Sequence, residues 1–316
     1  MIKADKYLVE TLKELRDSPY RDTHPRAKYA DGTLAHAKYI TQKQFKYNIA
    51  EGEFPINTLR TTAIKGGWYD IEAIYIKQTN IIEEMNPAIH SWWKDFVVKQ
   101  VLESKKIIPT FKFLNSLGQT YGHTVKRYDL MNKLLKGLED NPFGRRHILN
   151  LWQEQQMLDD PKALVPCAYM TNWNVREEDY SVAGYVIERH FPDGNIEKDK
   201  IRYLDVTLNQ RSQDYLTTCS INPIQYVMKA MAVAGHLTFT TGIKHEVGMF
   251  VHNVENVHAY ERNSWAIEEM LSREPLEQPT IKLKVNKNFY DYTIDDFEIT
   301  LPKGIEKLSK PLEIAI

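Results

Sequence analysis

The sequence predicts one domain that mixes helices and strands, of the α/β or α+β class. The chain has 316 residues, more than the most common domain size, but no Ser/Gly/Pro-rich linker divides it. Amphipathic helical patterns alternate with strand-like apolar runs along its length. Apolar residues make up 42% of the chain and charged residues 26%, as in a soluble globular protein with a full core. We therefore expect a single domain over residues 1–316.

Charge and cysteine content exclude several classes of function. A formal net charge of −1 argues against nucleic acid as the main ligand, because such proteins carry a strong basic excess. Cys167 and Cys219 are the two cysteines, and their spacing predicts neither a disulfide framework nor a metal site. Residues 1–6 contain no apolar leader, and no run of about 18 apolar residues occurs. We therefore expect a cytoplasmic protein without membrane association.

The first part of the chain predicts a helix, a loop and a strand. Apolar residues recur at helical spacing over residues 7–18. The polar stretch 21–37 follows and contains Arg26, and it is either an ordinary surface loop or a loop that closes over a ligand. Residues 38–48 alternate in polarity and carry aromatic side chains, which predicts a strand.

The pattern over residues 64–84 predicts a helix that carries Glu72 among apolar positions. A carboxylate on a buried face is costly unless it is paired or takes part in chemistry. Glu72 is therefore either a proton-handling group or an exposed residue on a rotated helix. Trp92 and Trp93 follow, either as core residues or as a wall for a flat ligand.

A glycine-bracketed turn at 118–122 presents Tyr121 and precedes an amphipathic helix over 128–140. Arg145 and Arg146 come directly after the end of that helix. Paired arginines at such a boundary either form a solvated edge or supply the forked donors that suit a phosphate. A strand is expected at residues 147–152.

Cys167 follows Pro166 at the head of an apolar, aromatic run that predicts a strand. A thiol acts as a nucleophile only when something lowers its pKa, because the thiolate is the reactive form. Two basic clusters, 144–147 and 210–214, are candidates for that role. The alternative is a buried structural thiol, and the local sequence leaves both interpretations open.

The second half predicts a long charged hairpin around 175–200, followed by a strand over 201–209. Ser220 or Asn222 could cap an apolar helix that runs to about His236. Residues 248–254 predict a strand, and His258 to Tyr260 are expected to open a further helix. The chain contains no P-loop and no GxGxxG in a strand-to-helix setting, so a nucleoside triphosphate or a Rossmann-bound cofactor is not indicated.

The order of these motifs, from about residue 20 to the end, resembles thymidylate synthase, most closely its bacilli-type and phage-type members. The motifs are Arg26 with Asp31-Gly32-Thr33, Tyr121-Gly122, Arg145-Arg146, Pro166-Cys167, Gln210-Arg211-Ser212 with Asp214, Asn222, His258 with Tyr260, and the apolar end 311–316. The resemblance implies an α+β sandwich around a large mixed sheet, with strands near 147, 167, 203 and 248. It also implies a homodimer that packs sheet to sheet and shares its active sites.

The resemblance assigns the residues to chemical roles. Cys167 would add to C6 of dUMP, whose C5 then attacks the methylene of the co-substrate 5,10-methylenetetrahydrofolate, and Glu72 with ordered water would relay protons. Catalysis is expected to involve Cys167, Glu72, Arg211, Asp214 and Tyr121. Nucleotide binding is expected from Arg26, Arg211, Ser212, Asn222, His258 and Tyr260, with Arg145 and Arg146 supplied by the other subunit. Folate contacts are expected from Trp92, Asp214, Thr218 and Ile316, and no metal is expected.

Three departures from the family pattern leave the final step open. Glu72-Ala73-Ile74-Tyr75 stands where the family usually has Glu-Leu-Leu-Trp, and the stretch after it is about two residues short. Thr217-Thr218-Cys219-Ser220-Ile221 replaces a segment with glycine and proline, and Glu255-Asn256-Val257-His258 replaces the usual Gly-Asp-x-His. The polar wall could admit water and give a dUMP hydroxymethylase, whereas the apolar tail favours a dry site and hydride transfer. A nucleotide-binding relative without activity is the third alternative.

Overall fold

The computed structural model describes residues 1–103, 111–159, 164–182, 184–191 and 195–315. The helices are α1 (Lys3–Asp17), α2 (Ile64–Ile71), α3 (His90–Trp93), α4 (Gly122–Arg127), α5 (Leu130–Asp140), α6 (Glu154–Asp159), α7 (Tyr215–Thr218), α8 (Ile221–Thr241) and α9 (Trp265–Leu271). The strands are β1 (Ala37–Asn48), β2 (Val98–Glu103), β3 (Phe111–Ser116), β4 (Ile148–Asn150), β5 (Ala168–Asp179), β6 (Ser181–Val182), β7 (Tyr185–Val186), β8 (Glu188–His190), β9 (Ile196–Lys198), β10 (Lys200–Gln210), β11 (Gln213–Asp214), β12 (Lys244–Tyr260), β13 (Thr280–Leu283) and β14 (Phe297–Thr300).

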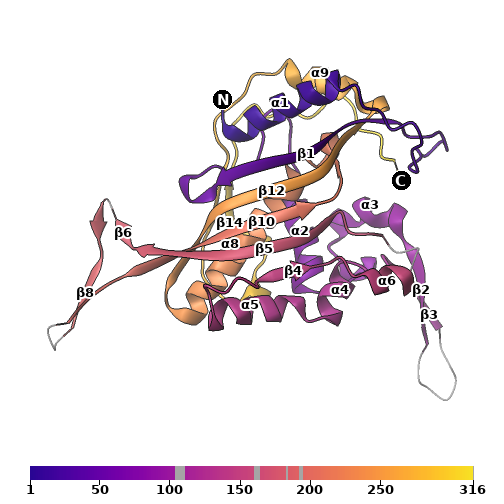
Figure 1. The fold of residues 1–316 in the computed structure, drawn as a ribbon. Helices are drawn as coiled ribbons and strands as arrows, with labels where there is room; N and C mark the ends of the chain where they lie inside the picture. Colours follow the sequence, from indigo (N-terminus) through magenta and orange to yellow (C-terminus); the bar gives the residue numbers. More distant parts are fainter. Residues whose placement is uncertain (104–110, 160–163, 183, 192–194, 316) are drawn as a thin grey trace.

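A six-stranded mixed sheet forms the centre of the molecule (Figure 1). Its strand order is β1-β12-β10-β5-β4, and β11 adds to β12. The β10–β12 and β11–β12 pairs are parallel, whereas β1–β12, β5–β10 and β4–β5 are antiparallel. The predicted α+β class with a large mixed sheet is confirmed.

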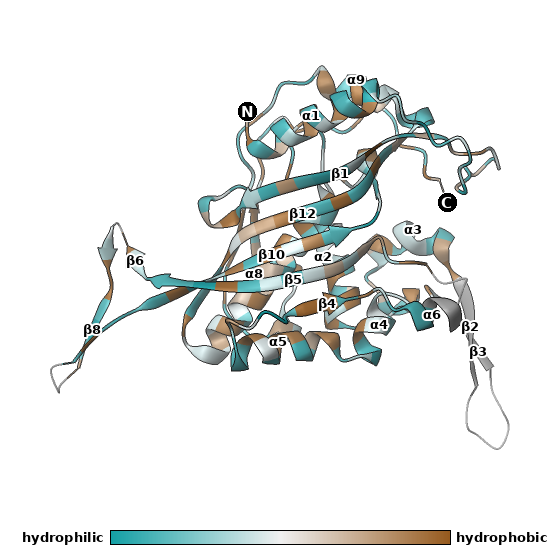
Figure 2. Ribbon diagram, in the orientation of Figure 1, coloured by the Kyte–Doolittle hydropathy of each residue, from teal (hydrophilic) through white to brown (hydrophobic). Residues whose placement is uncertain are grey.

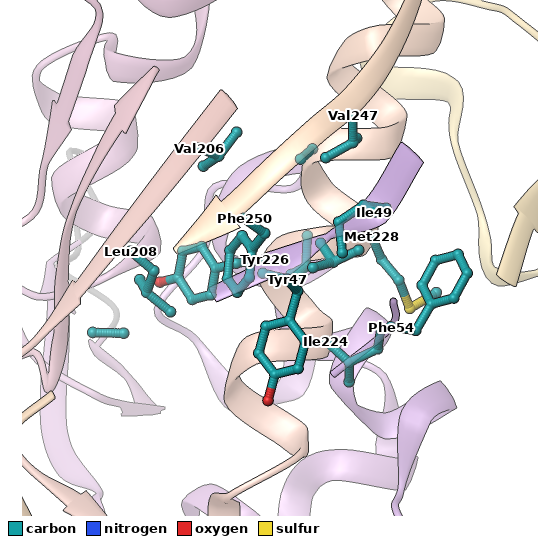
Figure 3. Packing of buried hydrophobic residues seen from close by; sticks show 14 of the residues in the cluster. Tyr47, Ile49, Phe54, Val206, Leu208, Ile224, Tyr226, Met228, Val247 and Phe250 are labelled. Atoms are coloured by element: carbon teal, nitrogen blue, oxygen red, sulfur yellow. The ribbon is translucent and has the colours of Figure 1, made fainter. Parts of the chain in front are cut away.

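Helix α8 covers one face of the sheet, with α2 packed against it (Figure 1). Figure 2 shows many apolar residues on α8, whereas polar and apolar residues are mixed along the strands in front of it. Val206, Leu208 and Phe250 point from β10 and β12 toward Ile224 and Met228 of α8 (Figure 3). A fully buried side chain of this kind contributes about 1.5–3 kcal/mol. The core therefore fixes α8, whose first turn carries Asn222, against the strands that carry the other candidate site residues.

The other face of the sheet carries a row of four hydrogen-bonded amides. Gln44 Nε2 donates to Asn253 Oδ1 at 2.9 Å, Asn253 Nδ2 to Asn209 Oδ1 at 3.1 Å, and Asn209 Nδ2 to Asn172 Oδ1 at 3.0 Å. The row crosses β1, β12, β10 and β5. Its members alternate along each strand with buried core residues, so they point away from α8. We call these four residues the amide row.

The charged hairpin extends well beyond the body of the molecule (Figure 1). Strands β5 and β10 pair from Ala168 with Gln210 to Asp179 with Lys200. Beyond that pair, the described residues form two short antiparallel pieces, β6 with β7 and β8 with β9. All described side chains of these four strands are exposed. We call residues 181–198 the ribbon tip.

Two element predictions are wrong. The helix expected over 64–84 ends early: α2 passes at Glu72 into a π-helical turn, Glu72–Ile76. His258 to Tyr260 do not open a helix, because they end the long strand β12 and pair with β1, Tyr260 lying opposite Ala37. Buried and half-buried residues continue to alternate through these three residues, as in a strand. This alternation is hard to recognise in the sequence over so short a stretch. Among the described residues, no helix is long and apolar enough to cross a bilayer.

Candidate active site

Cys167 lies immediately before β5 and is held there by two backbone contacts. Its carbonyl accepts from the backbone N–H of Arg211 at 2.9 Å, where β10 ends beside it. Its own backbone N–H donates to the phenol oxygen of Tyr121 at 3.2 Å. Burial raises the pKa of the Cys167 thiol, and the charges of Arg211 and Arg26 oppose this rise. The thiol therefore lies near two cations whose charges oppose the effect of burial without overcoming it.

The Arg211 side chain wraps the segment that leads into the cysteine. Its Nε donates to the Pro166 carbonyl at 2.9 Å and its Nη2 to the Val165 carbonyl at 3.0 Å. The same Nη2 lies 3.5 Å from Cys167 Sγ. The predicted proximity of Arg211 and Cys167 is thus present, and the guanidinium is fixed by three partners rather than left mobile.

Tyr121 approaches Cys167 from a strained turn. It adopts a φ of 44° at the start of α4, in the region that L-residues rarely occupy. Gly122 follows, and a Cβ there would lie 2.1 Å from the Thr79 carbonyl, so only glycine allows this approach. The ring of Tyr121 packs against Trp93, with 5.7 Å between centroids. Strain of this kind is found where a side chain must be held for function.

Asp70 of α2 completes this cluster, and the sequence had not singled it out. Its Oδ1 accepts from Trp93 Nε1 at 3.0 Å, and its Oδ2 accepts from Gln225 Nε2 at 3.0 Å. Burial raises the pKa of the Asp70 carboxyl to about 7, although these two hydrogen bonds lower it. Burial also raises the pKa of Tyr121, and the charges of Cys167 and Asp70 add to that rise. Asp70 therefore belongs to the same electrostatic neighbourhood as the thiol.

Glu72 does not occupy the environment that motivated its selection. Its carboxylate forms an ion pair with Lys77 Nζ at 3.1 Å, and 21% of its side chain is exposed. The carboxylate on the buried face is instead Asp70, two residues earlier, which has hydrogen-bond donors but no ion-pair partner among the described residues. A sequence signal for it existed, because Asp70 lies three residues after Gly67 and four before Ile74, and both are buried.

Asp214 and His258 face each other across the β11–β12 pair. Asp214 Oδ2 accepts from Thr217 Oγ1 at 2.5 Å, whereas its Oδ1 is buried without a hydrogen-bond partner among the described residues. Burial raises the pKa of Asp214 and lowers that of His258, and each charge opposes the shift of the other. An orphaned buried acceptor is costly, so this site suits a ligand that brings an N–H donor.

A cavity of about 500 Å³ opens beside these groups. Its lining includes Arg26, Ser212, His258 and Tyr260, all selected from the sequence, together with Arg21 and Asn256. His258 Nδ1 lies 3.1 Å from Asn256 Oδ1, which fixes the ring. The cavity therefore combines cations and hydroxyl or amide groups at one end with the buried aspartate nearby, as a phosphorylated polar ligand requires.

The other predicted site residues that the structure describes are not part of the cavity lining. Arg145 and Arg146 are exposed just before β4 and do not line it. Trp92 packs over Gly66 of α2, and Thr218 donates from Oγ1 to the Asp214 carbonyl at 2.9 Å. Asn222 is half-buried in the first turn of α8. Ile316 lies outside the described residues.

The sequence matches the family profile described as thymidylate synthase over residues 15–312. This chain belongs to the thymidylate synthase family. It is 35% identical over 303 residues to a thymidylate synthase of Streptococcus pneumoniae (strain 70585), covering 95% of this chain and 94% of the relative. A thymidylate synthase of Streptococcus gordonii is 33% identical over the same shares.

The fold is similar to that of the thermostable thymidylate synthase A from Bacillus subtilis, with a TM-score of 0.75. That match covers 99% of both chains at 24% identity. The family recognised from motif order is thereby confirmed, and the protein is a one-carbon transferase of the thymidylate synthase family. The roles of individual residues stay predictions.

Proposed function

We propose that this chain is a thymidylate synthase that converts dUMP to dTMP with 5,10-methylenetetrahydrofolate. The observation that carries the proposal is the 3.5 Å contact between Arg211 Nη2 and Cys167 Sγ, beside a cavity that holds Arg26 and Ser212. An anion-binding end next to a nucleophile is what covalent attack on a nucleotide base requires. The described residues include no cluster that could hold a metal ion.

In this mechanism the phosphate of dUMP binds Arg26, Arg211 and Ser212, and His258 with Tyr260 holds the ribose. The amide of Asn222 offers both a donor and an acceptor, which matches O4 and N3–H of uracil. The Cys167 thiolate adds to C6, and negative charge moves toward O4 and C5. C5 then attacks the methylene carbon. Loss of the C5 proton to a base breaks the bond between that carbon and the folate nitrogen, which leaves an exocyclic methylene on the nucleotide and frees tetrahydrofolate. Hydride transfer from tetrahydrofolate and expulsion of Cys167 yield dTMP and dihydrofolate.

Asp70, rather than Glu72, is the carboxyl that we assign to proton handling. A buried carboxyl with a pKa of about 7 is divided between both protonation states near neutral pH. It can therefore donate toward the developing charge at O4 through water and be recharged between turnovers. Trp93 and Gln225 hold it in place, and Tyr121 connects the same cluster to Cys167.

We assign Asp214 to the folate site. Among the described residues its Oδ1 has no hydrogen-bond partner, and such an acceptor matches the N–H donors of a pterin ring. We assign Trp92, Thr218 and Ile316 to the folate site as the family resemblance implies, with the tail closing over it to exclude water. The hydroxymethylase alternative is not favoured, because the similar curated proteins are thymidylate synthases.

We further infer one catalytic domain that works as a homodimer. Arg145 and Arg146 are exposed and do not line the cavity of their own subunit, which supports a role in the site of another copy. The amide row supports the same assembly. Each amide in it keeps hydrogen-bonding capacity, and a self-complementary face is what a two-fold interface needs.

The test is product analysis. The protein is incubated with dUMP and 5,10-methylenetetrahydrofolate, and both products are identified by mass. We expect dTMP with dihydrofolate, and none from Cys167→Ser, because a hydroxyl is a far weaker nucleophile at neutral pH. Formation of 5-hydroxymethyl-dUMP with tetrahydrofolate would establish the hydroxymethylase instead. Absence of any product and of any covalent adduct with 5-fluoro-dUMP would leave a nucleotide-binding protein.

A further inference from the structure

Arg262 connects two segments that lie far apart in the sequence. It follows β12 in a short turn, Glu261–Asn263. Its Nη2 donates to Asp31 Oδ2 at 2.8 Å and to Thr33 Oγ1 at 2.5 Å. Its Nη1 donates to Glu313 Oε2 at 2.9 Å. One guanidinium thus holds both the loop between α1 and β1 and the C-terminal tail, which lie side by side (Figure 1).

The loop side of this contact is a small hairpin that also carries Arg26. The Ala35 N–H donates to the Ala27 carbonyl at 2.9 Å, and Lys28 pairs with Leu34. Asp31 is fixed at the tip, where the Thr33 hydroxyl donates to Oδ1 at 2.6 Å. Thr33 and Arg262 together lower the pKa of Asp31 to about 2. Asp31 therefore stays ionised across the working pH range, and the ion pair to Arg262 persists.

The tail side is fixed by the neighbouring residue. Asn263 is fully buried, and its Nδ2 donates to the Glu313 carbonyl at 2.9 Å. The Glu313 N–H donates back to Asn263 Oδ1 at 2.9 Å. Asn263 thus anchors the backbone of Glu313, while Arg262 holds its side chain. Residues 314 and 315 follow directly after this anchor.

Arg262 is connected to the cavity wall through Tyr29. Its guanidinium lies over the ring of Tyr29, 4.1 Å from the centroid. The ring of Tyr29 in turn meets that of Tyr260, which lines the cavity, edge to face at 6.2 Å. A displacement of the Arg26 hairpin would therefore move Arg262 through two contacts, one with Asp31 and one with Tyr29.

We propose that Arg262 is a positioning residue that couples binding of the nucleotide phosphate at Arg26 to closure of the C-terminal tail over the folate. The inference rests on the proposed function, since it assumes that Arg26 binds phosphate and that the tail closes. Bound phosphate draws Arg26 and its hairpin inward, and Arg262 transmits that position to Glu313. Coupling between sites is reciprocal, so a closed tail also holds the nucleotide more tightly.

The first experiment removes the bridge while keeping its length. In Arg262→Met we expect KM for the folate to rise about fivefold or more, the low end of typical coupling between sites, while the affinity for dUMP measured without folate changes less. Water then reaches the methylene intermediate, so 5-hydroxymethyl-dUMP appears beside dTMP. Lys310→Met is the matched control, because it removes a tail cation that stacks on Trp265 and does not touch the hairpin. This control is expected to behave as the unaltered protein.

The second experiment reads the tail directly. Carboxypeptidase trims the C-terminus, and the rate is measured with and without dUMP. We expect dUMP to slow trimming of the unaltered protein and of Lys310→Met but not of Arg262→Met. Asp31→Asn should lose the same protection, and its combination with Glu313→Gln should cost less than the sum of the two single changes.

The outcomes separate this inference from the proposed function. If the unaltered protein forms no dTMP and no adduct, the proposed function fails. If it forms dTMP, but dUMP still protects the tail of Arg262→Met and its folate KM is unchanged, the coupling role is wrong. If Arg262→Met merely unfolds, it loses dUMP binding. Arg262→Lys then replaces it as the test, because it keeps the charge but loses the forked geometry. We expect dUMP to protect the tail of Arg262→Lys from carboxypeptidase only in part.

Discussion

A carboxyl group buried between an indole and an amide, as Asp70 is, gives the active site a titration near neutral pH. We expect kcat of the unaltered protein to fall as pH rises through about 7, because the proton that Asp70 donates is then lost. Asp70→Asn should lower kcat by about 10²–10⁴-fold and remove that limb of the pH profile. Glu72→Gln is the control and should keep the limb. If Glu72→Gln removes this limb of the pH profile and Asp70→Asn keeps it, Glu72 rather than Asp70 is the proton-handling group.

The same residue makes stability depend on pH, with a definite sign. Asp70 binds its proton up to about pH 7 when folded, but only up to about 3.8 when unfolded. Between these values the folded state holds more protons, so the free energy of unfolding decreases as pH rises through this window. Asp70→Asn lacks this titrating proton, so the free energy of unfolding should decrease less between pH 5 and pH 7. Urea unfolding of both proteins at the two pH values measures the difference.

Residue assignments from the sequence drew on two sources. Cys167 and the basic cluster 210–214 were singled out because a nucleophilic thiol needs cations nearby, whereas the roles of Arg26, Arg211 and Ser212 in phosphate binding came from the family resemblance. The structure brings these four residues together. Glu72 was chosen from helical phase, and the phase shifts because α2 widens into a π-turn at that residue. An insertion in the helical register cannot be read from periodicity alone.

Among the elements, the ribbon tip makes the clearest prediction. We expect replacement of residues 181–198 by Asn-Gly to leave activity unchanged and to shift Tm by no more than about 2–4 °C, which corresponds to a stability change of about 1 kcal/mol. The described side chains removed are exposed apart from the half-buried Ile187, and the flanking hydrogen bond from Tyr180 N to the Asp199 carbonyl is kept. Thermal unfolding and steady-state kinetics test this. A much larger loss of Tm would show that the tip packs onto the body or onto another subunit.

The first helix and the first strand were predicted correctly from their apolar spacing, whereas the helix expected over 64–84 and the last residues of β12 were not. Helix α1 and strand β1 follow their apolar spacing closely. The last residues of β12 were assigned to a helix, because their strand identity comes from pairing with β1 at Ala37 and with β11 at Asp214. Those contacts are long-range, and no local window contains them.

At the scale of the whole molecule, the shared-site proposal is tested by mixing two inactive variants. Cys167→Ser and Arg145→Ala should regain activity when their subunits exchange, because one site of each hybrid has both groups. With equal mixing, we expect up to about a quarter of the unaltered activity. Arg26→Ala mixed with Cys167→Ser is the control and should regain none, since both residues serve the same subunit's site. No recovery despite demonstrated exchange would place Arg145 and Arg146 outside the site.

The exposed position of Arg145 and Arg146, outside the cavity lining of their own subunit, has a consequence for enzyme dosage. If a complete site exists only between two copies, the number of working sites follows the concentration of pairs. Specific activity should then fall when the protein is diluted below the dissociation constant of the pair, whereas the affinity of each assembled site stays constant. A cell that makes few copies would lose thymidylate production out of proportion to the loss of protein.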